Sequence, residues 1–416
     1  MSQLDGYHMV IVSRYLTTLH DLFNIEKINK KYNGNLTKFH ANPIPINKDS
    51  IKYFPNIETL NIWSDSAETF GNEVFGPKLL KPKNKHTFFH INVWCEVEYN
   101  LTQTQTPAEV SYKNITYTMD DCKKYGELIP KTVTNLGLSC FNSTQKTAIT
   151  IPNNVTSLQR SCFFNAVSLV SVKLPKYLKE VGESCCHVCK DLTSFDMPNT
   201  VTSVGAGAFF ECKKLTMLSF PDGVTKIPEQ CCHNCEGLKS VTFPPFISSV
   251  GLFAFEECYS LQSVEIKNCQ YCIGKMAFYK CSNITSLSIG RTLKELGDEC
   301  CYKCEKLEKV ELPSSITRLG TCCFMKCSSL ASIKLPEKLS KVSYNCFDGC
   351  EKLEEIVIPE GVVVFEECAF KNCVNLKKKS FSGCSNLELV VPSTVTELGE
   401  NCFLGCLKVD DMTKKE

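Results

Sequence analysis

Apolar and polar residues alternate over a short stretch that recurs through most of the chain with a period of 23 residues. In LKSVTFPPFISSVGLFAFEECYS, Val241 and Phe243 fall on one face of a predicted strand, and Ser240 and Thr242 fall on the other. Proline follows and ends the strand, because it cannot donate a hydrogen bond to a ladder. Each unit therefore predicts a short strand with one buried face.

The second half of each unit predicts a turn and a closing segment that points inward. A second apolar pair, such as Val201 and Val204, is usually followed by glycine. Glycine there suits either a turn with positive φ or a close approach of two backbones. The unit then closes on a CFxxC pattern with apolar residues at i, i+1 and i+4, which predicts one inward-facing helical turn.

The prolines set the register of the array. They are spaced 22 residues apart once, then 23 apart until Pro359, and the last interval is 33; Lys267 and Gly290 take the same column without proline. The column holds Pro130, Pro152, Pro175, Pro198, Pro221, Pro244, Pro313, Pro336, Pro359 and Pro392. With a shortened unit, LKKKSFSGCSN, about twelve units fill residues 126–406, before a polar tail at 407–416. One unit cannot bury its apolar side alone, so the units must stack. The sequence predicts an α/β repeat solenoid with a ladder of parallel strands.

Ten of the 28 cysteines close successive units in a single column: Cys189, Cys212, Cys235, Cys258, Cys281, Cys304, Cys327, Cys350, Cys373 and Cys406. A column position recurs inside the stack, where cysteine packs as a small apolar residue. Parallel side chains in neighbouring coils keep their Cβ atoms about 4.8 Å apart, wider than the ~3.8 Å that a disulfide prefers. We therefore expect free, packed thiols.

The unit LEKVELPSSITRLGTCCFMKCSS resembles the BspA-like leucine-rich repeat, a 23-residue class, in its period, proline, glycine and closing (A/C)FxxC. The resemblance covers about two-thirds of the chain. It implies a right-handed leucine-rich-repeat superhelix with a parallel strand ladder and short helical turns. It also implies protein binding, cell-surface adhesion for some members, and no enzymatic activity.

Residues 1–125 show no such repeat and predict a small N-terminal α+β cap domain. Apolar residues recur at helical spacing between Val10 and Phe39, and VSRYLTTLHDLFNIEKINKKY resembles an F-box, which implies docking to a ubiquitin-ligase adaptor. The alternative is a helical cap over the apolar end of the array. FPNIETLNIW predicts one degenerate repeat strand, and FFHINVWCEVEY with VSYKNITYTM predicts a β-hairpin closed by TQTQTPAE.

The CxxC pairs raise the alternative of a cysteine-rich metal or redox protein. Three pairs occupy columns that elsewhere hold Phe and Cys, which favours packing; they are Cys186/Cys189, Cys232/Cys235 and Cys301/Cys304. A fourth pair, Cys269/Cys272, is off register. Only seven histidines occur, and none follows His233. We expect no catalytic, cofactor or metal site.

The net charge and the hydropathy of the chain argue against two classes of partner, nucleic acid and the membrane interior. The net charge of +1 gives no field that attracts nucleic acid, and no apolar stretch is long enough to insert into a membrane. The leader MSQLDGYHMVIVSRYL lacks the pattern of a signal peptide, which predicts a cytoplasmic protein, with the cell surface as the alternative that the resemblance implies.

The outward positions of the strand column form the candidate partner-binding face. They are polar, rich in serine and mixed in sign, and include Lys173, Asp196, Thr242, Glu265, Glu311 and Lys334. Such a surface suits either an extended protein contact or a merely solvated sheet, and it carries no basic stripe for phosphates. The sequence predicts a non-enzymatic protein-interaction module with a protein ligand and no small-molecule substrate or cofactor. An F-box-like adaptor and a thiol protein are the alternatives.

Overall fold

The computed structural model describes residues 5–76, 85–104, 109–376 and 395–406. The chain divides into two compact units, Met1–Asn135 and Leu136–Glu416, and the short strand β6 (Asn135–Leu136) lies where they divide. The shortened repeat unit and the polar tail predicted from the sequence fall outside the described residues.

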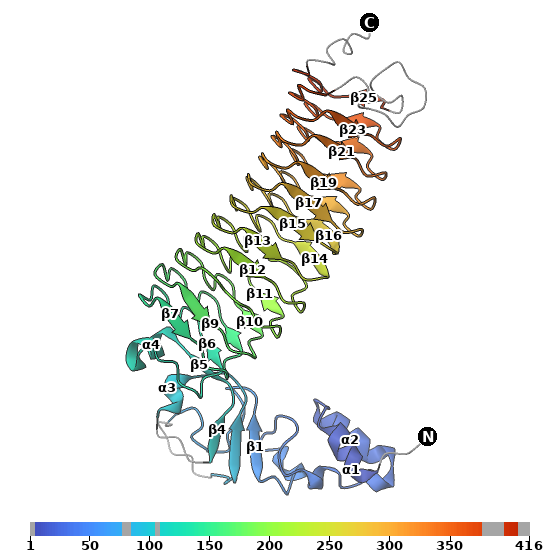
Figure 1. Ribbon diagram of the computed structural model, residues 1–416. Coiled ribbons are helices and arrows are strands. Elements are labelled where there is room, and N and C mark those ends of the chain that lie inside the picture. The colour runs from blue at the N-terminus through green and yellow to red at the C-terminus, as the bar shows by residue number, and fades with distance from the viewer. Residues whose placement is uncertain (1–4, 77–84, 105–108, 377–394, 407–416) are drawn as a thin grey trace. The chain divides into compact units, whose positions relative to one another are not determined.

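The second unit is a stack of coils, and each coil contributes a strand to one or both of two ladders (Figure 1). Ladder A comprises β7 (Ala148–Thr150), β9 (Ser171–Lys173), β12 (Met217–Ser219), β13 (Ser240–Thr242), β15 (Ser263–Ile266), β17 (Ser286–Ile289), β19 (Lys309–Glu311), β21 (Ser332–Lys334) and β23 (Glu355–Val357). Ladder B comprises β8 (Ser157–Leu158), β10 (Glu180–Val181), β11 (Ser203–Val204), β14 (Ile247–Val250), β16 (Cys269–Ile273), β18 (Glu295–Leu296), β20 (Arg318–Leu319), β22 (Lys341–Val342), β24 (Val364–Phe365) and β25 (Glu397–Leu398).

Strand pairing follows the 23-residue period. In ladder A, Ser263 pairs with Ser286 and Ser286 with Lys309, all in parallel register. Val264 and Leu287 point into the stack and are buried. The predicted α/β repeat solenoid, with parallel strands and one buried face per strand, is confirmed; it has about twelve turns and few helices.

Proline sets the length of the ladder A strands. Most of these strands have three residues, but β15 and β17 have four. They are the strands that precede Lys267 and Gly290, the two units without proline. There the backbone N–H of Gly290 donates to the carbonyl of Ile266 at 2.7 Å, a bond that proline could not make.

The closing segment of each coil forms hydrogen-bonded turns rather than the predicted helical turn. In one coil, His187 N donates to Ser184 O at 3.1 Å and Cys189 N to Cys186 O at 3.1 Å. Two residues of the turn have left-handed backbones, Ser184 with φ 52° and Val188 with φ 63°. A left-handed residue interrupts a right-handed helix, so CFxxC folds back toward ladder A within one turn.

The glycine that recurs in successive units reflects the close approach of backbones. Gly182 does not have a positive φ. A Cβ built at Gly182 would lie 2.6 Å from the carbonyl carbon of Gln159 and 2.7 Å from the oxygen of Leu158 in the preceding coil. Of the two explanations that the sequence allowed, close approach therefore applies here.

The first unit begins with two helices, α1 (Gly6–Ser13) and α2 (Leu19–Ile28). Thr18 caps α2, because its side chain accepts a hydrogen bond from Asp21 N. Met9, Ile25 and Tyr32 form a small buried cluster. Further short helices are η1 (Lys30–Tyr32), η2 (Leu36–Lys38), η3 (Ile51–Tyr53), α3 (Tyr99–Thr102) and α4 (Met119–Tyr125).

Strands of the first unit pair in the same parallel manner as those of the second. One sheet has the order β1 (Thr59–Ile62), β2 (His90–Val93), β4 (Val110–Tyr112), and β3 (Val97–Glu98) pairs with β5 (Ile115–Tyr117). The strand predicted in FPNIETLNIW is confirmed as β1. The predicted β-hairpin is wrong, because β2 and β4 run parallel, with Ile91 opposite Val110. Parallel pairing needs a crossover, which β3 and α3 provide.

Candidate functional site

The candidate partner-binding face is the outward surface of ladder A. The structure places Lys173, Thr242, Glu265, Glu311 and Lys334 on β9, β13, β15, β19 and β21, and Asp196 two residues beyond an isolated bridge that joins Ser171 to Ser194. All six predicted residues are exposed. The parallel register brings Glu265, Ser288 and Glu311 side by side on successive coils. We call this outward surface the A face.

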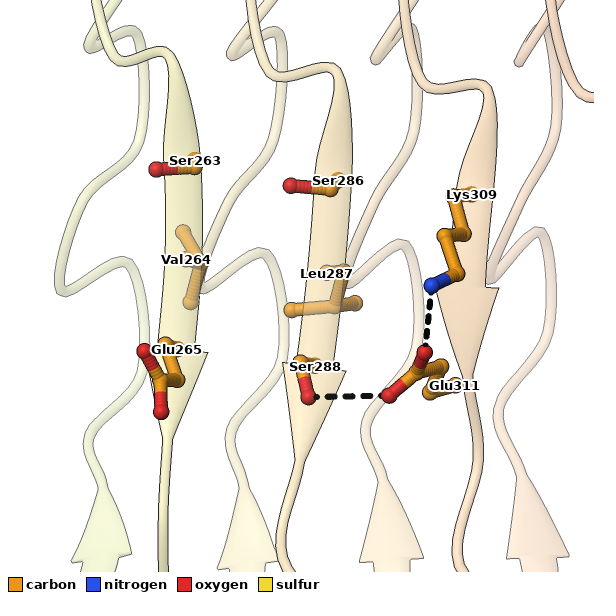
Figure 2. Close-up of a pocket in the computed structure, with 8 residues that line it drawn as sticks. All are labelled: Ser263, Val264, Glu265, Ser286, Leu287, Ser288, Lys309 and Glu311. Atoms are coloured by element: carbon orange, nitrogen blue, oxygen red, sulfur yellow. Dashed lines mark hydrogen bonds and ion pairs between the residues drawn. The ribbon is translucent and has the colours of Figure 1, made fainter.

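A shallow hollow of about 340 Å³ lies on the A face across β15, β17 and β19. Figure 2 shows the serine, glutamate and lysine side chains on one side of the strands, with Val264 and Leu287 beneath them. The hollow exists because serines stand between longer side chains; its lining is Ser263, Val264, Glu265, Ser286, Leu287, Ser288, Lys309 and Glu311.

Charges at the two ends of this hollow differ in their pairing. Lys309 Nζ lies 2.6 Å from Glu311 Oε1, and Ser288 Oγ donates to Glu311 Oε2 at 3.3 Å. The hydrogen bond and the charge of Lys309 lower the pKa of Glu311. Glu265, at the other end, makes no ion pair or side-chain hydrogen bond with any described residue. The carboxylate of Glu265 therefore remains available to an external group.

Several other charged side chains on the A face also lack a partner. Within the described parts of the chain, Lys173, Asp196 and Lys334 also have neither an ion-pair partner nor a side-chain hydrogen bond. These charges are mixed in sign, with basic Lys173 and Lys334 at either end and acidic Asp196 and Glu265 between them. The A face thus presents charges that the fold itself does not use.

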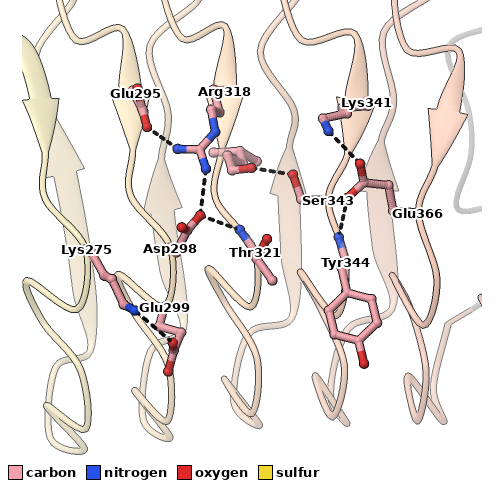
Figure 3. A network of polar contacts seen from close by, with 11 residues as sticks. Lys275, Glu295, Asp298, Glu299, Arg318, Thr321, Lys341, Ser343, Tyr344 and Glu366 are labelled. Atoms are coloured by element: carbon pink, nitrogen blue, oxygen red, sulfur yellow. Dashed lines mark hydrogen bonds and ion pairs between the residues drawn. The ribbon is translucent and has the colours of Figure 1, made fainter.

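Ladder B shows the opposite arrangement (Figure 3). Arg318 bridges Glu295 and Asp298, with Nη2 2.7 Å from Asp298 Oδ1. Lys341 Nζ lies 2.5 Å from Glu366 Oε1. Such exposed pairs add only about 0–1 kcal/mol each to stability. Glu295, Arg318 and Lys341 on ladder B are thus paired, whereas Lys173, Glu265 and Lys334 on the A face have no ion-pair partner among the described residues.

The column of closing cysteines has a role that sequence reasoning missed. Nine of the Sγ atoms donate to a carbonyl 26 residues earlier, and Cys406 donates to one 36 residues earlier; for Cys258 the acceptor is Cys232 O, at 3.1 Å. All ten members make such a bond, with Sγ–O distances of 3.0–3.2 Å. They are Cys189, Cys212, Cys235, Cys258, Cys281, Cys304, Cys327, Cys350, Cys373 and Cys406. The strict 23-residue column was the only signal in the sequence.

Burial disfavours the thiolate form of Cys258 and Cys212. Desolvation raises the pKa of Cys258 and of Cys212 well above the ordinary value. A protonated thiol donates a hydrogen bond but is a poor metal ligand and nucleophile. Across the described ranges, no group of three or more His, Cys, Asp or Glu side chains is arranged to hold a metal ion.

The off-register pair lies on β16 of ladder B, which carries a β-bulge, and not in a closing turn. Ile247 pairs with Cys269 and Ser249 with Cys272, so β16 carries one extra residue over this interval. Cys269 is buried, and desolvation raises its pKa to about 11, whereas Cys272 is half-buried. Cys269 Sγ donates to the backbone carbonyl of Cys272 at 3.5 Å.

Comparison with known families matches the repeats. The model described as the BspA type leucine-rich repeat region fits six copies, over residues 134–259, 248–377 and 374–416. The chain belongs to the BspA-type leucine-rich repeat family. The match begins at residue 134, so it gives no support to the F-box resemblance between residues 10 and 39.

Several solved structures of leucine-rich repeat proteins are similar to this chain. A leucine-rich cell surface protein from Faecalibacterium prausnitzii is 25% identical, over 61% of this chain and 84% of that one, with a TM-score of 0.34. A leucine-rich repeat protein from Bacteroides ovatus is 22% identical, over 64% and 87%, with a TM-score of 0.31. No curated protein matches the chain. Among the described helices, none has the length and apolarity needed to cross a bilayer.

Proposed function

We propose that this BspA-type chain is a non-enzymatic protein-binding module and that the A face is its partner contact. The family supports a protein-interaction repeat module. The observation that supports the A face is its set of unpaired charges, Lys173, Asp196, Glu265 and Lys334, beside the self-paired charges of ladder B. Electrostatic complementarity of this kind gives an interface its register and its specificity.

The partner that best fits this face is an extended protein segment that crosses successive coils. Coils repeat at about 4.8 Å, so a segment laid across the strands meets basic and acidic side chains in a fixed order, with Asp196 and Glu265 between Lys173 and Lys334. A basic side chain that enters the hollow between β15 and β19 would meet the free carboxylate of Glu265. Serine at the neighbouring positions leaves room for that side chain and supplies hydroxyl groups to it.

The other roles considered from the sequence lack such an observation. The F-box-like adaptor and the metal or redox protein stay predictions, as do the cap role of residues 1–125 and the cytoplasmic location. The cell surface is the setting that the resemblance implies for some members. Biotin labelling of intact source cells separates the two locations: labelled full-length protein places it at the surface, and protection until lysis places it inside.

Charge reversal on the A face tests the proposal. Partners captured from source-cell extract are identified by mass spectrometry, and each is then tested purified against the wild type, Glu265→Lys and Glu180→Lys. Glu180 is an exposed outward residue of β10 on ladder B, so its reversal changes the net charge equally. We expect Glu265→Lys to weaken binding about tenfold or more and Glu180→Lys to leave it unchanged. Equal effects of the two variants would contradict the A face as the contact.

A further inference from the structure

An aromatic column runs along the closing turns of four consecutive coils. Phe164 stacks on His187 with ring centroids 4.9 Å apart, and His187 stacks on Phe210 at 4.4 Å, with planes only 2° apart. Phe210 in turn stacks on His233 at 4.5 Å. Two imidazoles therefore occupy positions that phenyl rings fill in the neighbouring coils.

The next coil places a carboxylate in the same column. Glu256 Oε2 lies 2.9 Å from His233 Nδ1, and the two side chains are only 15% and 21% exposed. Burial raises the pKa of Glu256, and the charge of His233 opposes this shift. Farther along, Tyr279 and Tyr302 continue the column as a stack at 4.9 Å that contains no histidine.

We propose that this column is a pH-sensitive element, in which protonation of His187 loosens the turns that carry Phe164, His187 and Phe210. The imidazole of His187 lies between two phenyl rings, and its Nδ1 is buried without a hydrogen-bond partner among the described residues. Protonation of both ring nitrogens would charge the imidazole while leaving the Nδ1–H group buried without an acceptor.

Two effects on the charged form of His187 oppose each other. The faces of Phe164 and Phe210 attract a cation, and Glu211 also favours the protonated ring. Burial disfavours the charge more strongly, and a protonated His233 adds repulsion, so the pKa of His187 is lowered from its ordinary value. Desolvation is therefore the effect that sets the direction of the pKa shift of His187.

The remaining charged groups around the column do not compensate His187. Glu256 is engaged with His233, and Glu257 is engaged with Lys280, whose Nζ lies 2.7 Å from its Oε1. An acidic side chain lies beside His233 Nδ1, whereas no acidic side chain lies within ion-pair distance of His187 among the described residues. Acid is expected to act on the stack mainly through His187.

The sign of the pH dependence follows from the lowered pKa. The unfolded turn binds a proton near the ordinary histidine pKa of about 6.5, and the folded turn binds it only at lower pH. The stability that the neutral ring contributes is complete above that value and is lost as the pH falls below it. The loss continues until the pH reaches the lowered pKa of the folded state.

Hydrogen exchange with mass spectrometry measures this effect on the full chain. Between pH 7.5 and 5.5, after correction for intrinsic exchange rates, peptides over residues 184–189 and 207–212 are expected to lose protection about three- to tenfold. Peptides over 276–281 and 299–304, which carry the Tyr279–Tyr302 stack, serve as the internal control and should change little.

Two variants separate charge from stacking. His187→Phe keeps a ring in a column that already holds Phe164 and Phe210, so it should match the wild type at pH 7.5 and lose the pH dependence. His187→Gln breaks the stack without adding a charge, so it should reduce protection at both pH values. In the wild type, the nuclear magnetic resonance signal of His187 should titrate below the ordinary pKa. Titration at or above that value, or undiminished pH dependence in His187→Phe, would overturn the proposal.

Discussion

Replacing Gly290 with alanine is expected to destabilise the solenoid by about 4 kcal/mol or more, which is an exceptional loss for one methyl group. Gly290 takes the proline column in a unit without proline, where β15 and β17 run one residue longer. A Cβ at this position would overlap the carbonyl oxygen of Lys267 in the preceding coil. Both atoms belong to backbones that are held by ladder hydrogen bonds, so neither can move without breaking the register.

Gly361→Ala is the matched control for this substitution. A Cβ there would lie 3.2 Å from Glu337 O, and the residue is exposed, so small shifts accommodate it. We expect a change within about 1 kcal/mol, because alanine also restricts the unfolded chain. Urea unfolding followed by circular dichroism measures both variants. Equal midpoints for the two would show that the coils are not in contact at Gly290.

Substitutions of Cys258 are expected to cause the second large loss of stability. Its thiol is buried and donates to Cys232 O. Cys258→Asp buries a carboxylate among apolar neighbours and should cost several kcal/mol, about 3–5. Cys258→Ala loses a packed sulfur and a weak hydrogen bond, for about 1–2 kcal/mol. Cys258→Ser keeps a donor for the same carbonyl but buries a hydroxyl, so its loss should fall between those of the other two variants.

The control for this series is Cys272→Ala, at a half-buried thiol outside the closing column. It should change the melting temperature little. A metal or disulfide role for Cys258 predicts a different order, in which Ala and Ser are equally harmful and a chelator or reductant reproduces the loss. Melting curves of all four variants, each with and without both reagents, distinguish these accounts.

The parts of the fold that a periodic sequence determines could be predicted. The alternation of Val241 with Ser240 and Thr242 gives a strand with one buried face, and the strict spacing gives parallel stacking. The outward side of ladder A followed directly, since side chains alternate along a strand. Even the four-residue length of β15 and β17 is explained by the missing prolines at Lys267 and Gly290.

Features that depend on backbone conformation could not be predicted. The CFxxC spacing fits a helical turn equally well, and only the left-handed backbone at residues such as Val188 shows that the chain turns otherwise. The alternation of apolar and polar residues in β2 and β4 is the same for parallel and antiparallel pairing. The sequence therefore could not distinguish the predicted β-hairpin from the parallel pair that the structure contains. The extra residue in β16 likewise leaves no mark in the spacing of Cys269 and Cys272.

Side-chain contacts between coils could not be predicted from the sequence for a different reason. The bond from Cys258 Sγ to Cys232 O joins residues 26 apart, three more than the period, so alignment by column separates its partners. The stack of His187 between Phe164 and Phe210 joins chemically different residues in one column. The sequence alone does not show that these rings stack, because the stacking depends on the register of neighbouring coils.

The central claim, that the A face binds a protein partner, is tested most directly by hydroxyl-radical footprinting of the full chain, free and in complex with a captured, purified partner. We predict protection of exposed side chains on ladder A, with Met217 on β12 as a reactive reporter that is 62% exposed in the free chain. Tyr271 on β16, which is 57% exposed on ladder B, should keep its reactivity. Protection of Tyr271 with Met217 unchanged would contradict the account.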